Sequence, residues 1–487
     1  MHNNGFDNEK FVRIQSEEVK KRMSLFDSKL YLEFGGKLFD DLHASRVLPG
    51  FDPNSKIKFL KEFKDDAEII FCINANDIER KKMRADYGIT YDMELVRLIN
   101  ALREENLYVS SVVVTLYKGE ASIDKFRSMI EDMGIKTYVH YPTKGYPTDI
   151  ETIVSEEGYG KNEFIKTTRK LVVVTAPGPS SGKLATCLSQ LYHEHKNNVK
   201  AGYAKYETFP VWNLPLKHPV NVAYEAATAD LNDINMIDSF HLEAYNEKAV
   251  NYNRDLQTFP ILKNILEKIM NKDIYKSPTD MGVNMIGCCI SDDKKVKEAA
   301  KNEIIRRYLN AIVDVKMGKC DIEVAKRIKV LMNELKIDES NRKVINACHL
   351  KSIKEKKEVI ALKLPNGKII TGKQTDILSP ASSLFLNAIK ELTGIPDDVY
   401  LLSPLVLNPI LDLKKKLGNN KILHLDEVML SLSVCSVTNP IINSALDNMS
   451  KLNNLEAHSS YILSNEELKI LKNLKINITC DAVFKQL

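Results

Sequence analysis

The sequence lacks the cysteine patterns that mark common metal and disulfide frameworks. It has 8 cysteines in 487 residues, and none of them forms a Cys-x-x-Cys pair. No spacing of cysteine and histidine matches a zinc site. Several cysteines stand among apolar residues, as in Ile-Phe-Cys-Ile at 70–73. We therefore expect reduced cysteines in a reducing compartment.

Long apolar runs are also absent. No stretch approaches the roughly 20 consecutive apolar residues that a membrane-spanning helix requires. Residues 1–22 carry charges throughout and contain no apolar segment of the kind found in signal peptides. The sequence therefore predicts a cytoplasmic protein with no membrane partner.

Charge of one sign is not in excess. The net charge is +4, from 69 basic and 65 acidic residues. A dedicated nucleic-acid binder shows a strong basic excess on one element, so the balance argues against that function. Apolar residues make up 44% and charged residues 28%, which is ordinary for a globular protein. A large chain with balanced charge is also a candidate for a homo-oligomer.

Alternating strand and helix patterns fill residues 1–220. Helical periodicity occurs at 8–28, 57–63, 92–105 and 122–133. Short apolar strands are predicted at Lys29–Phe34, Glu68–Asn74, Val109–Leu116, Ile135–His140 and Leu171–Thr175. Apolar strands separated by helices are typical of βαβ units in a parallel sheet. We expect an open, doubly wound α/β domain with a mostly parallel sheet, as in Rossmann and P-loop folds.

The pattern changes beyond residue 220. Residues 221–340 are mainly helical, and the clearest helices are Val296–Val315 and Ile322–Leu335. Strand patterns return within 341–487, where Asn366 and Gly367 separate two apolar runs and predict a hairpin. At about 150 residues per domain, three domains are expected: the α/β domain, a central helical domain and a C-terminal α+β domain.

The most informative motif is Leu-Val-Val-Val-Thr-Ala-Pro-Gly-Pro-Ser-Ser-Gly-Lys, where an apolar strand runs through a glycine-containing loop into a helix. The first N–H groups of a helix lack intrahelical partners and carry partial positive charge, so such a loop can bind phosphate. The backbone of Gly178, Ser180, Ser181 and Gly182 would surround the phosphate. Lys183 would offset its charge.

The match to the P-loop pattern is incomplete. Pro177 occupies the position of the first glycine, and Pro179 removes one N–H donor. Leu184 follows Lys183, where the pattern requires a hydroxyl for Mg²⁺. The alternative interpretation is a tight strand-to-helix turn that needed small residues.

A second loop of the same type follows the first predicted strand, at Gly35, Gly36 and Lys37. Ligands of open parallel sheets bind beyond the carboxyl ends of the strands. If the strands are correct, this loop lies beside Asn74 and the 176–183 loop. The crevice would be polar and basic, and it would also contain Asn76, Asp77, His140 and Lys144.

Acidic and histidine residues suggest metal binding. Asp230 and Asp233 are three residues apart, so on a helix they could share a face and hold Mg²⁺ beside a phosphate. Solvated helix charges are the alternative interpretation. A metal-dependent hydrolase would use the histidines and the glutamate of two further segments, His193, His195, His241 and Glu243.

Five long segments resemble a large uncharacterised bacterial family, described as a domain of unknown function. They are LYLEFGGKLFDDLHASRVLPGF (30–51), INANDIERKKMRADYGITYD (73–92), VVVTAPGPSSGKLATCLSQLYHEHK (172–196), AGYAKYETFPVWNLPLKHPVNVAYEAATADLNDINMID (201–238) and YKSPTDMGVN (275–284). The resemblance covers the whole chain. It implies a cytoplasmic bacterial protein with α/β, helical and α/β parts in that order. Some members are labelled ATP-dependent peptidase, but this sequence carries no peptidase motif, and no catalytic residue comes from the resemblance.

Three functional hypotheses remain. The first is an enzyme that binds a nucleotide such as ATP with Mg²⁺, or another phosphorylated small molecule, for phosphoryl transfer or ATP-coupled chemistry. In it, Lys183 and Lys37 are the candidate catalytic residues. The second is a non-catalytic nucleotide sensor or scaffold, favoured by the missing hydroxyl after Lys183. The third is the metal-dependent hydrolase.

Overall fold

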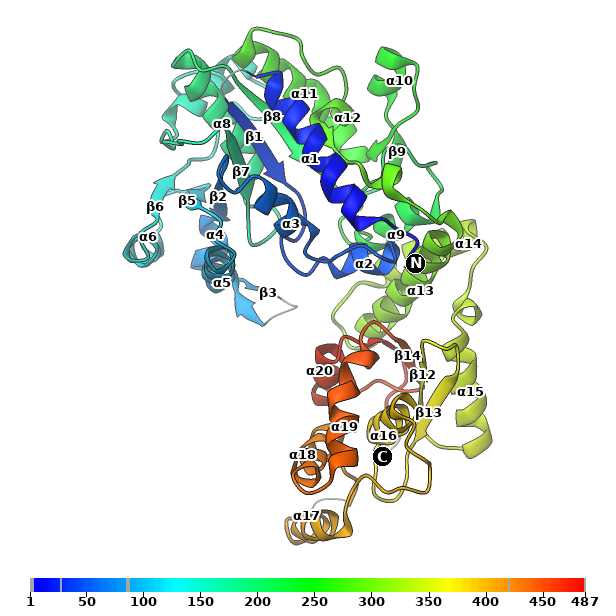
Figure 1. Cartoon of the computed structure of the whole chain (residues 1–487). Coiled ribbons are helices and arrows are strands. Elements are labelled where there is room, and N and C mark those ends of the chain that lie inside the picture. Colours follow the sequence, from blue (N-terminus) through cyan, green and yellow to red (C-terminus); the bar gives the residue numbers. More distant parts are fainter. Residues whose placement is uncertain (1–3, 27–28, 85–87, 419–420, 486–487) are drawn as a thin grey trace. The chain divides into compact units, whose positions relative to one another are not determined.

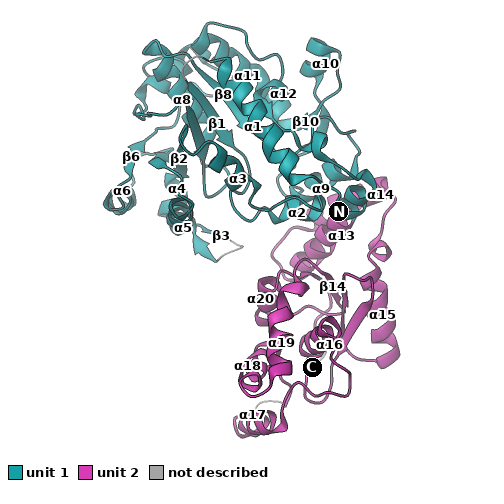
Figure 2. Ribbon diagram, viewed as in Figure 1, with its two compact units in different colours: residues 1–301 teal, residues 302–487 magenta. Residues whose placement is uncertain are grey.

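Figure 1 presents a computed structural model of the chain, which describes residues 4–26, 29–84, 88–418 and 421–485. The chain divides into two compact units, Met1–Lys301 and Asn302–Leu487 (Figure 2). We call them unit 1 and unit 2. The finer division into three domains stays a prediction.

Unit 1 is built on a seven-stranded sheet with the order β11-β8-β1-β7-β2-β5-β6. Its strands are β1 (Lys29–Phe34), β2 (Ala67–Asn74), β5 (Val109–Thr115), β6 (Lys136–Val139), β7 (Leu171–Thr175), β8 (Ala201–Tyr206) and β11 (Gly282–Val283). All neighbouring strands in it run parallel. The predicted α/β class with an open parallel sheet is therefore confirmed.

Helices surround this sheet, and two small antiparallel pairs lie apart from it. The pairs are β3 (Met83–Arg84) with β4 (Ile89–Thr90), and β9 (Asn235–Ile237) with β10 (Val250–Tyr252). The helices are α1 (Asn8–Ser24), α2 (Leu42–Val47), α3 (Ser55–Glu62), α4 (Ala75–Glu79), α5 (Tyr91–Glu104), α6 (Ser122–Asp132), α7 (Ile150–Ile153), α8 (Lys183–Lys196), α9 (Pro219–Ala227), α10 (Ser239–Tyr245), α11 (Asn253–Met270) and α12 (Pro278–Met281). Residues 27–28 of the first predicted helix lie outside the described residues.

The central strands are apolar because both faces of the sheet are covered. The first four residues of β7 are completely buried, and α8 packs against β1, β7 and β8. The sequence pattern missed β8 and β11. In β8, Gly202 and Lys205 interrupt the apolar run, and β11 is only two residues long. Gly202 is required there because a Cβ would lie 2.2 Å from the ring of Phe26.

The connections that leave β1 and β7 run in opposite directions. From β1 the chain passes over β7 to reach β2, whereas from β7 it passes over β1 to reach β8. Adjacent strands with divergent connections form a topological switch point, where loops separate and leave a crevice at the carboxyl edge. The loops after β1 and β7 therefore flank the place where parallel α/β sheets most often bind ligands.

Unit 2 contains a four-stranded mixed sheet with the order β13-β12-β14-β15. Its strands are β12 (Val359–Lys363), β13 (Ile369–Lys373), β14 (Glu456–Ser459) and β15 (Asn477–Cys480). The predicted hairpin is confirmed as β12 and β13, which pair antiparallel, whereas β14 and β15 run parallel. The helices are α14 (Ile322–Glu334), α15 (Lys343–Glu355), α16 (Pro380–Thr393), α17 (Pro404–Lys416), α18 (Leu425–Ser436), α19 (Pro440–Asp447) and α20 (Asn465–Asn473), and α13 (Asp293–Lys316) crosses the boundary between the units.

The two faces of the small sheet bury different partners. Ile360 and Leu362 belong to a large core with Leu384 of α16, whereas Val359 packs with Cys348 of α15. This alternation follows from the two-residue period of a strand. It places α15 and α16 on opposite faces of the sheet. Among the described residues, no helix is both long and apolar enough to cross a membrane.

Candidate functional site

The 176–182 loop connects β7 to α8 and depends on two glycines. A Cβ at Gly178 would lie 2.2 Å from the ring of Tyr91. Gly182 has φ +80°, and a Cβ there would lie 2.9 Å from Thr115. Small residues are therefore required by packing. The tight-turn interpretation and the phosphate-site hypothesis predict the same backbone here.

Side chains from two neighbouring strands hold this loop. The Thr115 hydroxyl donates to the Ser181 carbonyl at 2.8 Å, and the Asn74 amide donates to the Ser180 carbonyl at 3.3 Å. Asn74 also caps α4 by accepting from the N–H of Asn76 at 2.9 Å. The structure thus places Asn74, a site residue predicted from the sequence, in contact with the loop. Thr115 was not singled out, although it lies one residue before the end of the predicted strand Val109–Leu116.

The start of α8 has unused hydrogen-bonding capacity. Gly182 is its N-cap, so no side chain caps the first turn. Ser181 is 3% exposed, and its buried hydroxyl has no hydrogen-bond partner among the described residues. A buried polar group without a partner is unfavourable unless something else supplies one. Lys183 is half-buried and, within the same described part of the chain, forms no hydrogen bond or ion pair.

The loop after β1 is held by a lysine that was missed from the sequence. Lys56 of α3 is 3% exposed, and its ammonium donates to the carbonyls of Gly35 and Lys37, each at 2.8 Å. It also pairs with Asp41 at 3.6 Å. Gly36 has φ +67°, and the Lys37 side chain is exposed. A lysine in an amphipathic helix gives no sequence signal of this role.

The charges of Lys56 and Lys183 influence each other. Burial lowers the pKa of Lys56, the Asp41 carboxylate opposes that shift, and the charge of Lys183 lowers the pKa further. Two cations, Lys56 on α3 and Lys183 at the start of α8, therefore lie near each other. Lys56 has a carboxylate partner, so Lys183 is the cation of this pair that is available to an anion.

Near the carboxyl end of β8, the sheet edge is less basic than the crevice that the sequence predicted. Lys205 pairs with Glu207 and with Asp255 of α11, each at 2.7 Å. Burial raises the pKa of Glu207, and the Lys205 charge opposes that shift. Two carboxylates thus surround one ammonium at this position. These residues were missed because β8 itself was not predicted.

The two candidates after β6 contribute no free positive charge. Burial lowers the pKa of His140 to about 4, and the ring Nε2 lies 3.0 Å from the Glu163 carbonyl. His140 is therefore neutral near pH 7. Lys144 is exposed and pairs with Glu157.

The predicted magnesium ligands do not share a helical face, so that expectation is wrong. Helix α9 ends at Ala227, and both aspartates lie in the turns that follow. Asp230 is exposed, whereas Asp233 is 4% exposed and pairs with Arg254 at 3.1 Å. Burial raises the pKa of Asp233, and the Arg254 charge opposes that shift. Their role as metal ligands stays a prediction.

The predicted histidine cluster does not converge. His193 and His195 bond to backbone carbonyls at 2.8 and 2.7 Å, and His241 lies 3.0 Å from the Ser277 hydroxyl. Within the described residues, one group of three metal-ligating side chains has ligand atoms within 4.8 Å of one another, and it lies in unit 2. Its members are His349, His458 and Asp481.

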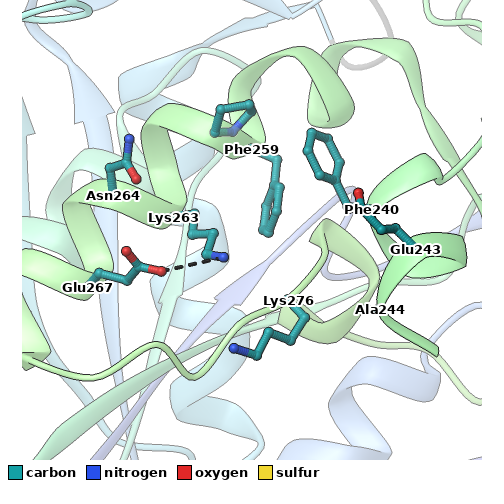
Figure 3. A pocket seen from close by; sticks show the side chains of 9 residues that line it. Phe240, Glu243, Ala244, Phe259, Lys263, Asn264, Glu267 and Lys276 are labelled. Atoms are coloured by element: carbon teal, nitrogen blue, oxygen red, sulfur yellow. Dashed lines mark ion pairs between the residues drawn. The ribbon is translucent and has the colours of Figure 1, made fainter.

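A pocket of about 410 Å³ lies beside α10 and α11 (Figure 3). It is lined by Phe240, Glu243, Ala244, Phe259, Pro260, Lys263, Asn264, Glu267 and Lys276. Lys263 pairs with Glu267 at 3.5 Å, and Lys276 pairs with Asp273. Because both lysines already have carboxylate partners, this pocket offers an anion less than the switch-point edge does.

Comparison with known proteins identifies one family over nearly the whole chain. Residues 4–336 match the N-terminal model of the domain of unknown function DUF1846, and residues 340–487 match its C-terminal model. A UPF0371 protein of Clostridium tetani is 53% identical and covers 98% of this chain and 97% of its own length. UPF0371 proteins of Streptococcus thermophilus and Fusobacterium nucleatum are 50% and 51% identical, and each covers at least 98% of both chains.

Proposed function

This chain belongs to the DUF1846 family, and we propose that it binds a nucleotide or another phosphorylated small molecule at the 176–183 loop. The main supporting observation is the position of that loop at the switch point, with Lys183 at its end, whose ammonium has no partner among the residues that the structure describes. We also propose that the protein acts in the cytoplasm.

The chemistry of the loop suits a phosphate group. The uncapped N–H groups at the start of α8 and the helix dipole attract negative charge. The unpartnered Ser181 hydroxyl could donate one further hydrogen bond. Lys183 supplies a full positive charge. The loop after β1, with Gly35, Gly36 and Lys37, would border the rest of the ligand from the other side of the switch point.

Whether catalysis follows depends on how a metal would be held. With ATP and Mg²⁺, Asp230 and Asp233 are the proposed metal ligands, and Lys183 and Lys37 the proposed catalytic cations. Asp233 would have to exchange its ion pair with Arg254 for the metal. Leu184 offers no hydroxyl to Mg²⁺, which favours the second candidate function, a nucleotide sensor or scaffold without turnover.

The test is thermal unfolding with a ligand panel. ATP, GTP, ADP, NAD, coenzyme A and sugar phosphates are each added with and without Mg²⁺. A ligand at 100 times its dissociation constant stabilises its unit by about 2.7 kcal/mol. For a unit of about 300 residues, that corresponds to a shift of roughly 4–5 °C in Tm. The chain's single tryptophan, Trp212, lies in unit 1 and reports its unfolding separately.

Lys183→Ala should abolish the shift. Lys196→Ala is the matched control, because Lys196 ends the same helix, is 55% exposed and pairs with Glu156. No shift with any ligand in the wild type contradicts the proposal and favours the tight-turn interpretation. Turnover of the bound nucleotide distinguishes the enzyme from the sensor.

A further inference from the structure

Two histidines and an aspartate converge in unit 2, far from one another in sequence. His349 lies on α15, His458 on β14, and Asp481 directly follows β15. The Nε2 of His349 lies 2.8 Å from one oxygen of Asp481, and the Nε2 of His458 lies 3.1 Å from the other. The parallel pairing of β14 with β15 fixes this arrangement, because Asp481 donates its N–H to the Ser459 carbonyl at 2.9 Å.

The two ring nitrogens of His458 face different partners, Thr479 at Nδ1 and Asp481 at Nε2. The Thr479 hydroxyl donates its hydrogen to the Ala457 carbonyl at 3.2 Å and accepts from Arg342 at 2.6 Å. Its remaining lone pair faces the Nδ1 of His458 at 2.9 Å. When the Thr479 hydrogen lies on the Ala457 carbonyl, Nδ1 is the donor in its contact with Thr479.

In the neutral tautomer, the Nε2 lone pair of His458 then points at a carboxylate oxygen. Two acceptors 3.1 Å apart repel unless a cation or a proton lies between them. His458 is completely buried, so water cannot screen the contact. Arg342 is itself ion paired with Glu456.

The spacing suits a zinc-type ion. Zinc bonds to histidine nitrogen and carboxylate oxygen are about 2.0–2.2 Å long, which places tetrahedral ligand atoms about 3.3 Å apart. The two histidine–aspartate distances are 2.8 and 3.1 Å, each to a different oxygen of Asp481, and one ligand atom from each of the three residues lies within 4.8 Å of the other two. The Thr479 contact is the outer hydrogen bond that metal-binding histidines usually make.

We propose that His349, His458 and Asp481 form a binding site for a zinc-type transition-metal cation. The site goes beyond the phosphate-binding function and lies in the other unit. The His349 side chain is 44% exposed and that of Asp481 is 25% exposed, so the fourth position opens to solvent. A water molecule or a small ligand would complete the coordination, as in zinc sites with three protein ligands.

The test is metal titration of the full-length chain. The protein is stripped with a chelator, titrated with Zn²⁺ by calorimetry, and then with Co²⁺ by visible absorption as a probe of tetrahedral geometry. The expected result is one ion per chain. Asp481→Asn and His349→Ala should lose this binding, and neither residue is needed for the core because both are partly exposed. Thr479→Val should weaken Zn²⁺ binding by about 10–100-fold.

The matched control is His424→Gln. It removes another histidine–carboxylate pair of unit 2, in which His424 lies 3.7 Å from Glu467, and it should leave binding unchanged. The proposal is overturned if the wild type binds neither cation. It is also overturned if His349→Ala and Asp481→Asn bind as tightly as the wild type. Because unit 1 takes no part, failure here leaves the phosphate proposal standing.

Discussion

The two units hold their polar clusters in different ways. At the switch-point edge of unit 1, Lys56 and Thr115 hold the loops through carbonyl groups, and within the described part of the chain the Lys183 side chain has no partner. In unit 2, His458 and Asp481 contact each other directly, and the mixed sheet brings them together. The first arrangement has an excess of positive charge and suits an anion. In the second, two histidines and a carboxylate converge, and this arrangement suits a cation.

The strongest test of this contrast removes the lysine that holds the β1 loop. Lys56→Ala leaves Asp41, whose side chain is only 15% exposed, without this cation and frees two carbonyls, so we expect a loss of about 3–5 kcal/mol in the free energy of unfolding. Urea unfolding followed by Trp212 fluorescence measures it in unit 1.

Lys58→Ala is the control for that change. Lys58 is on the same helix, is 56% exposed and pairs with Asp52 at 2.6 Å. Exposed pairs contribute about 0–1 kcal/mol. Equal effects of the two substitutions would show that Lys56 does not hold the loop.

The next test concerns the pH dependence of unit 1. His140 has a folded-state pKa of about 4, below the value of about 6.5 expected when unfolded. Between these pH values the unfolded state binds more protons, so stability rises with pH in this window and is lost as pH falls. His140 alone should remove about 3 kcal/mol between pH 7 and pH 4.

His140→Gln cannot titrate, so its stability should fall less steeply than that of the wild type over this window. The measurement is the urea midpoint of Trp212 fluorescence at a series of pH values. Parallel pH curves for the two proteins would mean that His140 is not kept neutral in the folded state.

The smallest expected effect distinguishes crowding from backbone strain in the 176–182 loop. Gly182→Ala and Gly134→Ala both place a side chain at positive φ, at +80° and +77°. A left-handed conformation costs about 1–2 kcal/mol at each position. Gly182→Ala should lose about 1–3 kcal/mol more, because its Cβ would also contact Thr115, whereas nothing lies within 4 Å at Gly134. Equal losses of stability by thermal unfolding would contradict close packing of the loop against β5.

Much of unit 1 could be predicted because parallel α/β structure leaves a strong local pattern. β1 and β7 have the predicted bounds, since buried parallel strands are continuous apolar runs. The carboxyl ends of parallel strands lie at one edge of the sheet. Locating the strands in the sequence was therefore enough to predict that Asn74 and the 176–182 loop lie at the same edge, where they are hydrogen bonded. The proposal that this edge binds phosphate still awaits its test.

Other parts left no such pattern. β8 contains Gly202, which lies against the ring of Phe26, and Lys205, which pairs with Asp255, and both partners lie elsewhere in the sequence. Asp230 has helical spacing to its neighbours, but Thr228 ends α9 first. Propensity and periodicity describe neighbours in sequence, and these outcomes depend on contacts between distant segments.

The sequence by itself determined the α/β class, the glycine-containing loop before α8 and membership of the family, because each depends on residues adjacent in the chain. Tertiary structure alone decided that Lys56 reaches the β1 loop and that the Lys183 side chain has no partner among residues 4–26, 29–84, 88–418 and 421–485. It also decided that His349, His458 and Asp481 meet. The reason is physical: strand pairing and helix packing bring together residues that lie 21 positions apart, as Lys56 and Gly35 do, or 132 positions apart, as His349 and Asp481 do, and a local pattern carries no record of these contacts.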